Sequence, residues 1–198
     1  YNNNEIKIIF NLSGYYIDLA KKGETRITFP GGAPILEKGS PDLPCIAKSI
    51  IISDLSNMEL EITDVSYIDV PLSGLLPSKG NITRNVRPSS IAYTYGKVYE
   101  TDLFYPQEIA FLRDPYILRS VRGQTIVFQP LQYNPVTKIM RVYTQIKTRI
   151  YERGLSVINP LVQRSLVNNI TREYKNIYDQ HFLNFTESSI RYEPVEEG

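Results

Sequence analysis

Hydrophobic and polar residues alternate over much of this chain, in short stretches rich in Ile, Val, Thr and Tyr. Gly, Pro, Asn and Asp separate these stretches, which is the pattern of an all-β domain. Segments 30–34 and 39–44, rich in Gly and Pro, predict turns or sheet edges. The stretches that we expect to form strands are 6–10, 26–29, 49–52, 60–68, 124–128 and 140–151.

The clearest expected strand is 140–151. Its aliphatic residues Val142, Ile146 and Ile150 alternate with polar residues and with Tyr143, which predicts one buried face and one exposed face. We expect it to pair with 124–128 through an ordered connection at 132–138, where Asn-Pro is typical of a turn. Strands spaced in this way predict two packed antiparallel sheets, a jelly-roll-like β-sandwich.

The periodicity changes after Gly154. A short amphipathic helix with Thr171 as its N-cap is expected to pack on the sandwich. The residues at helical spacing are Ile170, Tyr174, Ile177, Tyr178 and Phe182. The polar stretch that follows predicts an exposed tail suited to proteolysis. We therefore expect one domain over 1–185 and a tail over 186–198.

Length, composition and charge narrow the classes of function. The 198 residues, 42% hydrophobic and 22% charged, are enough for a buried core. The net charge of +1 predicts no attraction to nucleic acid, and no apolar run is long enough to span a bilayer. No signal-peptide core precedes Tyr1, so the signal of an exported protein would already have been removed.

Few residues offer catalytic or metal-binding chemistry. Cys45 and His181 are the only cysteine and histidine, and a Cys–His dyad is possible but disfavoured. We expect Cys45 to be a small buried thiol and His181 a surface imidazole. No metal-ligand spacing is present, so no metal or other cofactor is expected.

Two carbohydrate-related functions stay open on sequence grounds. Asp102, Glu108 and Asp114 lie close along the chain and could supply the two carboxylates of a glycosidase, although loop carboxylates usually cap turns or face water. The 15 tyrosines suggest a carbohydrate-binding β-sandwich module, the alternative function that we keep. The absence of Trp argues against it.

Several long runs contain uncommon residue combinations: 77–80 (PSKG), 93–96 (YTYG), 104–110 (FYPQEIA), 114–124 (DPYILRSVRGQ) and 130–138 (PLQYNPVTK). They closely resemble the prodomain of the gingipains, secreted cysteine proteases of the caspase-like clan, and especially of the Arg-specific members. Segment 39–44 (GSPDLP) resembles the GxPxLP element of these prodomains, and 174–185 resembles their C-terminal helix.

The resemblance implies a propeptide and not an enzyme, because the catalytic Cys and His of the family belong to the following domain. The implied partner is the catalytic domain of the chain's own Arg-specific cysteine protease. The implied location is export to the bacterial periplasm and then to the cell surface or medium. Segment 189–197 resembles the junction with the mature enzyme, so Arg191–Tyr192 would be the activation cleavage bond.

The resemblance also implies how latency is imposed. In the family, an Arg of a prodomain loop enters the specificity pocket of the protease, and the matching position here is Arg84, flanked by Thr83 and Asn85. Segment 85–88 departs from the family pattern and adds Arg87, so either arginine could fill the pocket. Pro88 disfavours cleavage after Arg87, which makes Arg84 the preferred candidate and a possible secondary cleavage site.

We also expect a role of the domain in folding and a role for three other arginines. The same docked surface could assist folding of the protease. The arginines at 113, 119 and 122 are expected to serve the sandwich or the wider interface, because they lie in a dense apolar stretch.

Overall fold

The structure, a computed structural model, describes residues 5–19, 24–162 and 172–186. Two short 3-10 helices lie in the long connection that follows β6. The elements are β1 (Ile6–Asn11), β2 (Tyr16–Leu19), β3 (Thr25–Thr28), β4 (Ala33–Pro34), β5 (Pro44–Ile51), β6 (Ser56–Pro71), η2 (Pro88–Ser90), η3 (Lys97–Glu100), β7 (Ala110–Leu112), β8 (Tyr116–Leu118), β9 (Val121–Phe128), β10 (Leu131–Asn134), β11 (Ile139–Leu155) and α1 (Arg172–His181).

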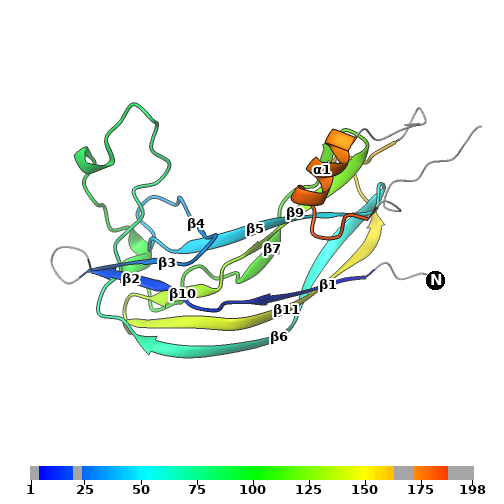
Figure 1. The fold of residues 1–198 in the computed structure, drawn as a ribbon. Coiled ribbons are helices and arrows are strands. Elements are labelled where there is room, and N and C mark those ends of the chain that lie inside the picture. The colour runs from blue at the N-terminus through cyan, green and yellow to red at the C-terminus, as the bar shows by residue number, and fades with distance from the viewer. Residues whose placement is uncertain (1–4, 20–23, 163–171, 187–198) are drawn as a thin grey trace, which may run out of the picture.

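Two antiparallel sheets lie one above the other (Figure 1). In the first sheet, the long strand β11 pairs with β6 along one side and with β1 and β10 along the other. In the second sheet, β9 pairs with β5, β7 and β8, and β4 extends the sheet beyond β5. Strands β2 and β3 form a separate ribbon. The predicted antiparallel β-sandwich with a short C-terminal helix is confirmed.

The space between the sheets is filled by aliphatic and aromatic side chains. Ile126 of β9 and Ile146 of β11 are fully buried within one cluster. The Phe10 ring stacks on Phe128 with ring centres 5.1 Å apart, which joins β1 to the other sheet. Each such burial contributes on the order of 2 kcal/mol, so alternation along the strands is the main force that sets the two inner faces.

A second core cluster lies around β3, β10 and the start of β11, and it supports the long connection after β6. Leu43, Leu75 and Leu131 are at most 1% exposed. Leu75 is bridged to Thr25 of β3, and the amide of Leu76 donates to the Thr25 carbonyl at 3.0 Å. The chain is therefore firmly placed just before it leaves the sandwich.

The predicted pairing of 124–128 with 140–151 is wrong. Residues 124–128 belong to β9, which lies in the other sheet beside β5. The chain changes sheet at Pro130, whose ring removes a backbone donor and whose carbonyl accepts from the Tyr143 amide at 2.8 Å. Strand β10 then pairs with β11. The Asn134 side chain accepts from the amides of Val136 and Thr137, so the expected turn chemistry is present but over 134–138.

Strand β11 also departs from simple alternation at Tyr143, which is buried and not exposed as predicted. The register against β6 shifts between Tyr143 and Gln145, so Thr144 is an extra residue in a β-bulge. The bulge places Val142 and Tyr143 both inside, and the Tyr143 hydroxyl donates to Gln132 at 2.9 Å.

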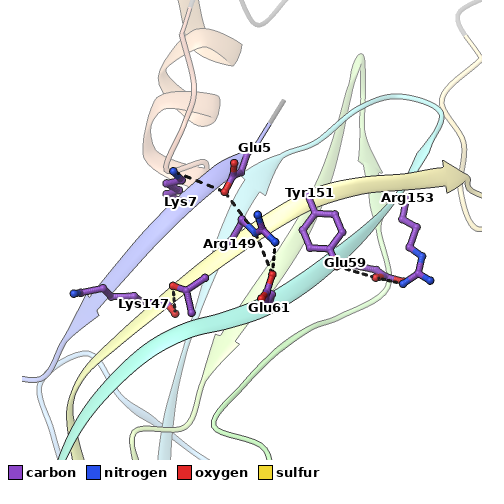
Figure 2. A network of polar contacts seen from close by, with 9 residues as sticks. Glu5, Lys7, Glu59, Glu61, Lys147, Arg149, Tyr151 and Arg153 are labelled. Atoms are coloured by element: carbon purple, nitrogen blue, oxygen red, sulfur yellow. Dashed lines mark hydrogen bonds and ion pairs between the residues drawn. The ribbon is translucent and has the colours of Figure 1, made fainter. Parts of the chain in front are cut away.

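Carboxylate side chains of β6 lie on an exposed face of the first sheet, opposite basic side chains of the neighbouring strand β11 (Figure 2). Glu59 meets Arg153 at 2.7 Å, and Asp64 meets Lys147 at 2.8 Å. Glu61 pairs with Arg149, which also reaches Glu5 of the segment leading into β1. Exposed pairs of this kind add little to stability, because solvent screens them, but they favour one strand register over its neighbours.

Helix α1 covers one end of the second sheet (Figure 1). Tyr178 is fully buried and Phe182 nearly so, against Val121 and its neighbours. The predicted helix is confirmed over Arg172–His181, whereas Thr171, its expected N-cap, and the tail from 187 lie outside the described residues. No helix in the described ranges is both long and apolar enough to cross a membrane.

Candidate functional site

Residues 81–95 form a long loop that leaves the sandwich and rises above it, at the upper left of Figure 1. The loop contains only one short element, η2. Every residue in it is exposed except Ile82 and Ile91, which are half-buried. A loop with so little burial presents its side chains to a partner and not to its own core.

Both ends of the loop are fixed to the same turn of the sandwich, at Gly39 and Ser40. The Ser78 carbonyl accepts from the Gly39 amide at 2.9 Å, and the Ser78 amide donates to the Ser40 carbonyl at 2.8 Å. At the other end, the Gly96 amide donates to the Gly39 carbonyl at 2.9 Å. Gly39 has a φ of 85°, a conformation that a side chain would disfavour. The loop is thus long but closed at its base.

Arg84 lies in a turn of this loop. The Val86 amide donates to the Thr83 carbonyl at 3.0 Å, which makes Arg84 and Asn85 the two central residues of the turn. Thr83, Arg84 and Asn85 are all exposed. Within the described ranges the Arg84 guanidinium has no hydrogen bond or ion pair. Its five donors are therefore available to an external acceptor.

Arg87 is also exposed, but its backbone is held differently. Its carbonyl accepts from both the amide and the hydroxyl of Ser90, at 3.0 and 2.8 Å. It stands at the N-terminus of η2, with Pro88 following directly. A carbonyl used in this way is less free to enter a protease cleft than that of Arg84, which accepts no backbone bond from the residues in 5–19, 24–162 and 172–186.

The arginines of the apolar stretch have separate roles. Arg119 has a φ of 56° and places its guanidinium 4.0 Å from the centre of the Tyr174 ring, which ties α1 to the turn after β8. Arg113 is exposed beside β9. The expectation that these residues serve the sandwich holds for Arg119 and, most clearly, for Arg122.

Arg122 is a fully buried guanidinium, 1% exposed, whose five hydrogen bonds all go to neutral oxygens. Its Nη1 donates to the carbonyls of Ser53 and Ser56 at 2.6 and 2.7 Å. Its other nitrogens donate to the Ser156 hydroxyl and to the carbonyls of Ile158 and Asn159. Burial lowers the pKa of Arg122. The fork of this side chain thereby joins the β5–β6 turn to the segment after β11, a role that the sequence did not show.

Cys45 and His181 do not form a catalytic pair. Cys45 lies at the start of β5, while residue 49 of the same strand is the one bridged to Phe182, next to His181. Four strand residues correspond to about 13 Å, beyond the reach of a nucleophile–base contact. Burial raises the pKa of the Cys45 thiol, which keeps it protonated. His181 is exposed, as expected, with its Nε2 2.6 Å from the Tyr116 hydroxyl.

Two of the three carboxylates considered for glycoside hydrolysis, Asp102 and Glu108, have different environments in the structure. Asp102 accepts from the Asn134 side chain at 2.7 Å. Glu108 is one of the residues that line an open groove of about 690 Å³. Apolar and aromatic side chains form much of its lining, including Leu103, Phe104 and Phe111. No group of three or more His, Cys, Asp or Glu side chains is gathered as a metal site among the described residues.

Several exposed tyrosines are already engaged with other side chains, which leaves them poorly placed to stack on sugars. Lys79 lies 4.1 Å from the centre of the Tyr93 ring. Tyr95 meets Tyr99 edge to face and donates to Glu24. Tyr67 lies beneath the Arg141 guanidinium at 4.3 Å.

The expected cleavage bond Arg191–Tyr192 lies outside the described residues.

The chain matches the family model Propeptide_C25 over residues 6–190. Gingipain R2 of Porphyromonas gingivalis is 43% identical over 178 residues, which are 89% of this chain and 24% of that protein. Gingipain R1 of the same organism is 41% identical over 177 residues, 89% of this chain and 17% of that protein. Lys-gingipain is 22% identical over 162 residues. The chain spans about a quarter or less of the length of these curated relatives.

Two solved structures share the fold. A complex of Porphyromonas gingivalis RgpB pro- and mature domains matches with a TM-score of 0.79 and 35% identity, over 93% of this chain and 94% of that chain. A structure concerned with the zymogenic latency of gingipain K matches with a TM-score of 0.65 and 21% identity, over 76% of this chain and 87% of that chain. The second match bears on the fold alone.

Proposed function

Because this chain belongs to the Propeptide_C25 family, we propose that it keeps an Arg-specific cysteine protease latent by placing Arg84 in the specificity pocket of that protease. The chain corresponds to the propeptide of its gingipain relatives and not to their catalytic part. The observation that carries the proposal is an exposed arginine that has no partner among the described residues, in a turn of a loop whose base is fixed.

The chemistry of the guanidinium supports Arg84 as the residue recognised. A protease that selects Arg over Lys needs a carboxylate at the floor of its pocket, since the planar fork of donors pairs with two oxygens at once. The Arg84 side chain offers that fork without first breaking a bond to any residue that the structure describes. Arg87 is the weaker candidate, because its carbonyl is held by Ser90 and Pro88 follows it.

One side chain does not make a stable complex, which normally buries about 1,600 Å² in total. Exposed apolar side chains beside the loop base offer part of the remaining contact. Leu36 and Leu103 are 51% and 54% exposed, and Tyr95 is 48% exposed. We propose that this face docks on the catalytic domain around the cleft, with Arg84 as the hot spot.

The test is inhibition of the cognate mature protease by the separate prodomain and its variants. Arg84→Ala should weaken binding by about 2–5 kcal/mol, because it leaves the pocket carboxylate buried and unpaired. Arg87→Ala is the matched control, and it should change the inhibition constant by less than about threefold, as expected of a rim charge. An inhibition constant unchanged by Arg84→Ala would exclude Arg84 from the mechanism, and loss of inhibition only with Arg87→Ala would transfer the role.

The remaining parts of the proposal concern processing and export. We propose that the protein is exported from a bacterial cell with its protease, that cleavage at Arg191–Tyr192 separates the two, and that the docked surface also assists folding. Arg191→Gln should leave the precursor uncut at that bond, as seen on gels and by mass spectrometry. Refolding yields of the protease with and without the prodomain in trans would test the folding role.

A further inference from the structure

Strand β6 forms the margin of the first sheet, and one of its two edges has no neighbouring strand among the described residues. Only β11 pairs with it, along Ser56–Pro71. Figure 1 shows β6 along the lower margin of the molecule, on the opposite side from the loop of residues 81–95 and from α1. We propose that this free edge binds an extended, basic segment of another protein, which adds to the first sheet as a further strand.

The hydrogen bonds around β11 identify the backbone groups of β6 that point to the free edge. The Leu72 amide donates to the Lys138 carbonyl at 2.9 Å, so alternate residues before Leu72 bond to β11 and those between them point away. On the other side of β11, the Leu12 amide donates to the Thr144 carbonyl at 3.0 Å, which sets the alternation beyond the bulge in the same way. The residues whose amides and carbonyls point outward include Leu60, Ile62, Tyr67 and Asp69.

This edge lacks most of the features by which natural sheets prevent strand addition. Residues 56–70 contain no Lys, Arg or Pro, although a bulge follows Ile62. Ile62 and Ile68 lie opposite the buried Thr148 and Val142, and yet they are 39% and 53% exposed. These two side chains face the space between the sheets at its open margin. Aliphatic side chains of an added strand would cover them.

The charges of β6 decide what kind of strand fits. All of its charged residues are acidic: Glu59, Glu61, Asp64 and Asp69. Glu59 uses Oε2 to accept from Arg153 and Tyr151, and Glu61 uses Oε2 to accept from Arg149. Within 5–19, 24–162 and 172–186, no hydrogen bond reaches the Oε1 atom of either glutamate. Two carboxylate oxygens are thus open to new donors, about 7 Å apart along the strand.

Lys or Arg at alternate positions of an added strand would match this spacing, because side chains on one face of a strand repeat every second residue. The aliphatic residues between them would point to Ile62 and Ile68. Backbone hydrogen bonds would then provide the affinity and the two sets of side chains the selectivity.

The same charges argue against a second copy of β6 as the added strand. Two β6 strands, paired in either direction, would bring only carboxylates together across the new pair. Like charges directly opposite each other are destabilising in a sheet. The occupant is therefore a different segment, basic on one face and aliphatic on the other.

The experiment measures binding of a probe peptide to the full chain. The probe alternates valine with lysine and is as long as residues 59–69. One control peptide has glutamate in place of lysine. A second is the lysine peptide with an N-methyl group on every amide, which keeps the charge but removes the backbone donors. The protein variants are Glu59→Gln with Glu61→Gln, and the matched control is Glu100→Gln with Glu108→Gln, two exposed glutamates outside β6.

We expect the lysine peptide to bind the unchanged chain and to slow exchange of the outward-pointing amides, Leu60, Ile62, Tyr67 and Asp69, by at least about tenfold in NMR spectra. Both control peptides should bind at least about tenfold more weakly. The Glu59→Gln, Glu61→Gln variant should also lose about tenfold in affinity, and the matched control less than about threefold. Unchanged amide protection in β11 would show that the fold of each variant is intact.

The inference fails if the lysine peptide does not bind, or if it protects amides elsewhere than in β6. Equal binding of the N-methylated peptide would also overturn it, because the contact would then be electrostatic only. A dimer in sedimentation, with the β6 amides already protected, would assign the edge to a second copy instead. None of these results involves Arg84 or the protease, so they leave the proposed function untouched.

Discussion

The backbone of Gly96 lies directly against that of Gly39, with the Gly96 amide 2.9 Å from the Gly39 carbonyl oxygen. A Cβ added at Gly96 would lie 3.0 Å from that oxygen, and its other close neighbours are also backbone atoms. Backbone on both sides leaves nothing flexible to give way. This contact closes the loop that carries Arg84, so it links a local packing constraint to the proposed site.

Gly96→Val should therefore open the base of the loop. We expect a loss of about 1–3 kcal/mol in the free energy of unfolding, the usual range for a crowded substitution. Inhibition of the protease should weaken as well, because Arg84 would be less well placed. Gly14→Val is the control, since no atom of the described residues lies within 4 Å of a Cβ at Gly14. Equal unfolding free energies for the two variants in urea would contradict the prediction.

Arg122→Met should be among the most destabilising single changes in the sandwich. It removes the donor from several part-buried oxygens, including the carbonyls of Ser53 and Ser56, at up to about 1–3 kcal/mol for each group left unsatisfied. We expect a total loss of at least about 3 kcal/mol in urea unfolding. Arg153→Met, which breaks an exposed pair with Glu59, should cost far less than Arg122→Met, because solvent screens exposed charges. A similar cost for both would show that the buried fork contributes little.

The stability of the fold at acidic pH should depend on two carboxylates, Asp69 and Asp42, whose pKa values are shifted in opposite directions. The hydrogen bond from Arg141 holds the pKa of Asp69 below its ordinary value, whereas burial raises the pKa of Asp42 although Arg26 opposes it. Asp69 therefore adds stability above its unfolded pKa of about 3.9, and this stability is lost as pH falls through the lower folded pKa. Asp42 does the reverse, and its stability contribution decreases as pH rises from about 4 through its raised folded pKa.

Asp69→Asn should consequently flatten the loss of stability in acid, and Asp42→Asn should steepen it. Urea unfolding at several values between about pH 3 and pH 6 measures both slopes. Parallel curves for the two variants would contradict the assignment of the shifts.

Helix α1 should depend on Asn184 for its place on the sheet. The Asn184 side chain accepts from the Ile51 amide at 2.8 Å and donates to the Ile51 carbonyl at 2.9 Å, as a neighbouring strand would. A ten-residue helix is marginal by itself, so its order depends on docking. Asn184→Ala should raise hydrogen exchange in α1 by about tenfold, equivalent to about 1.4 kcal/mol, and leave β11 unchanged. Asn176→Ala, at an exposed helix position, is the control, and equal exchange in both variants would refute the role.

Local periodicity was sufficient for much of the architecture. Strands at 60–68 and 140–151, the sandwich class, and a helix over Arg172–His181 are confirmed, because burial of one strand face or one helix stripe follows from the spacing of side chains alone. The position of Arg84 came from resemblance to a family and remains a prediction, as does the division at 185. The Propeptide_C25 match supports that family and does not test the residue.

Only the tertiary structure decided which segments lie next to each other. A period of two tells which residues face the core but not which strand lies alongside, so the pairing of β9 with β5 and the bulge at Tyr143 were not predictable. In the sequence Arg122 is indistinguishable from a surface arginine, because the oxygens that accept its hydrogen bonds come from segments 34 to 69 positions away. The free edge of β6 is equally hidden, since the strands that lie beside it depend on the fold and not on residue type.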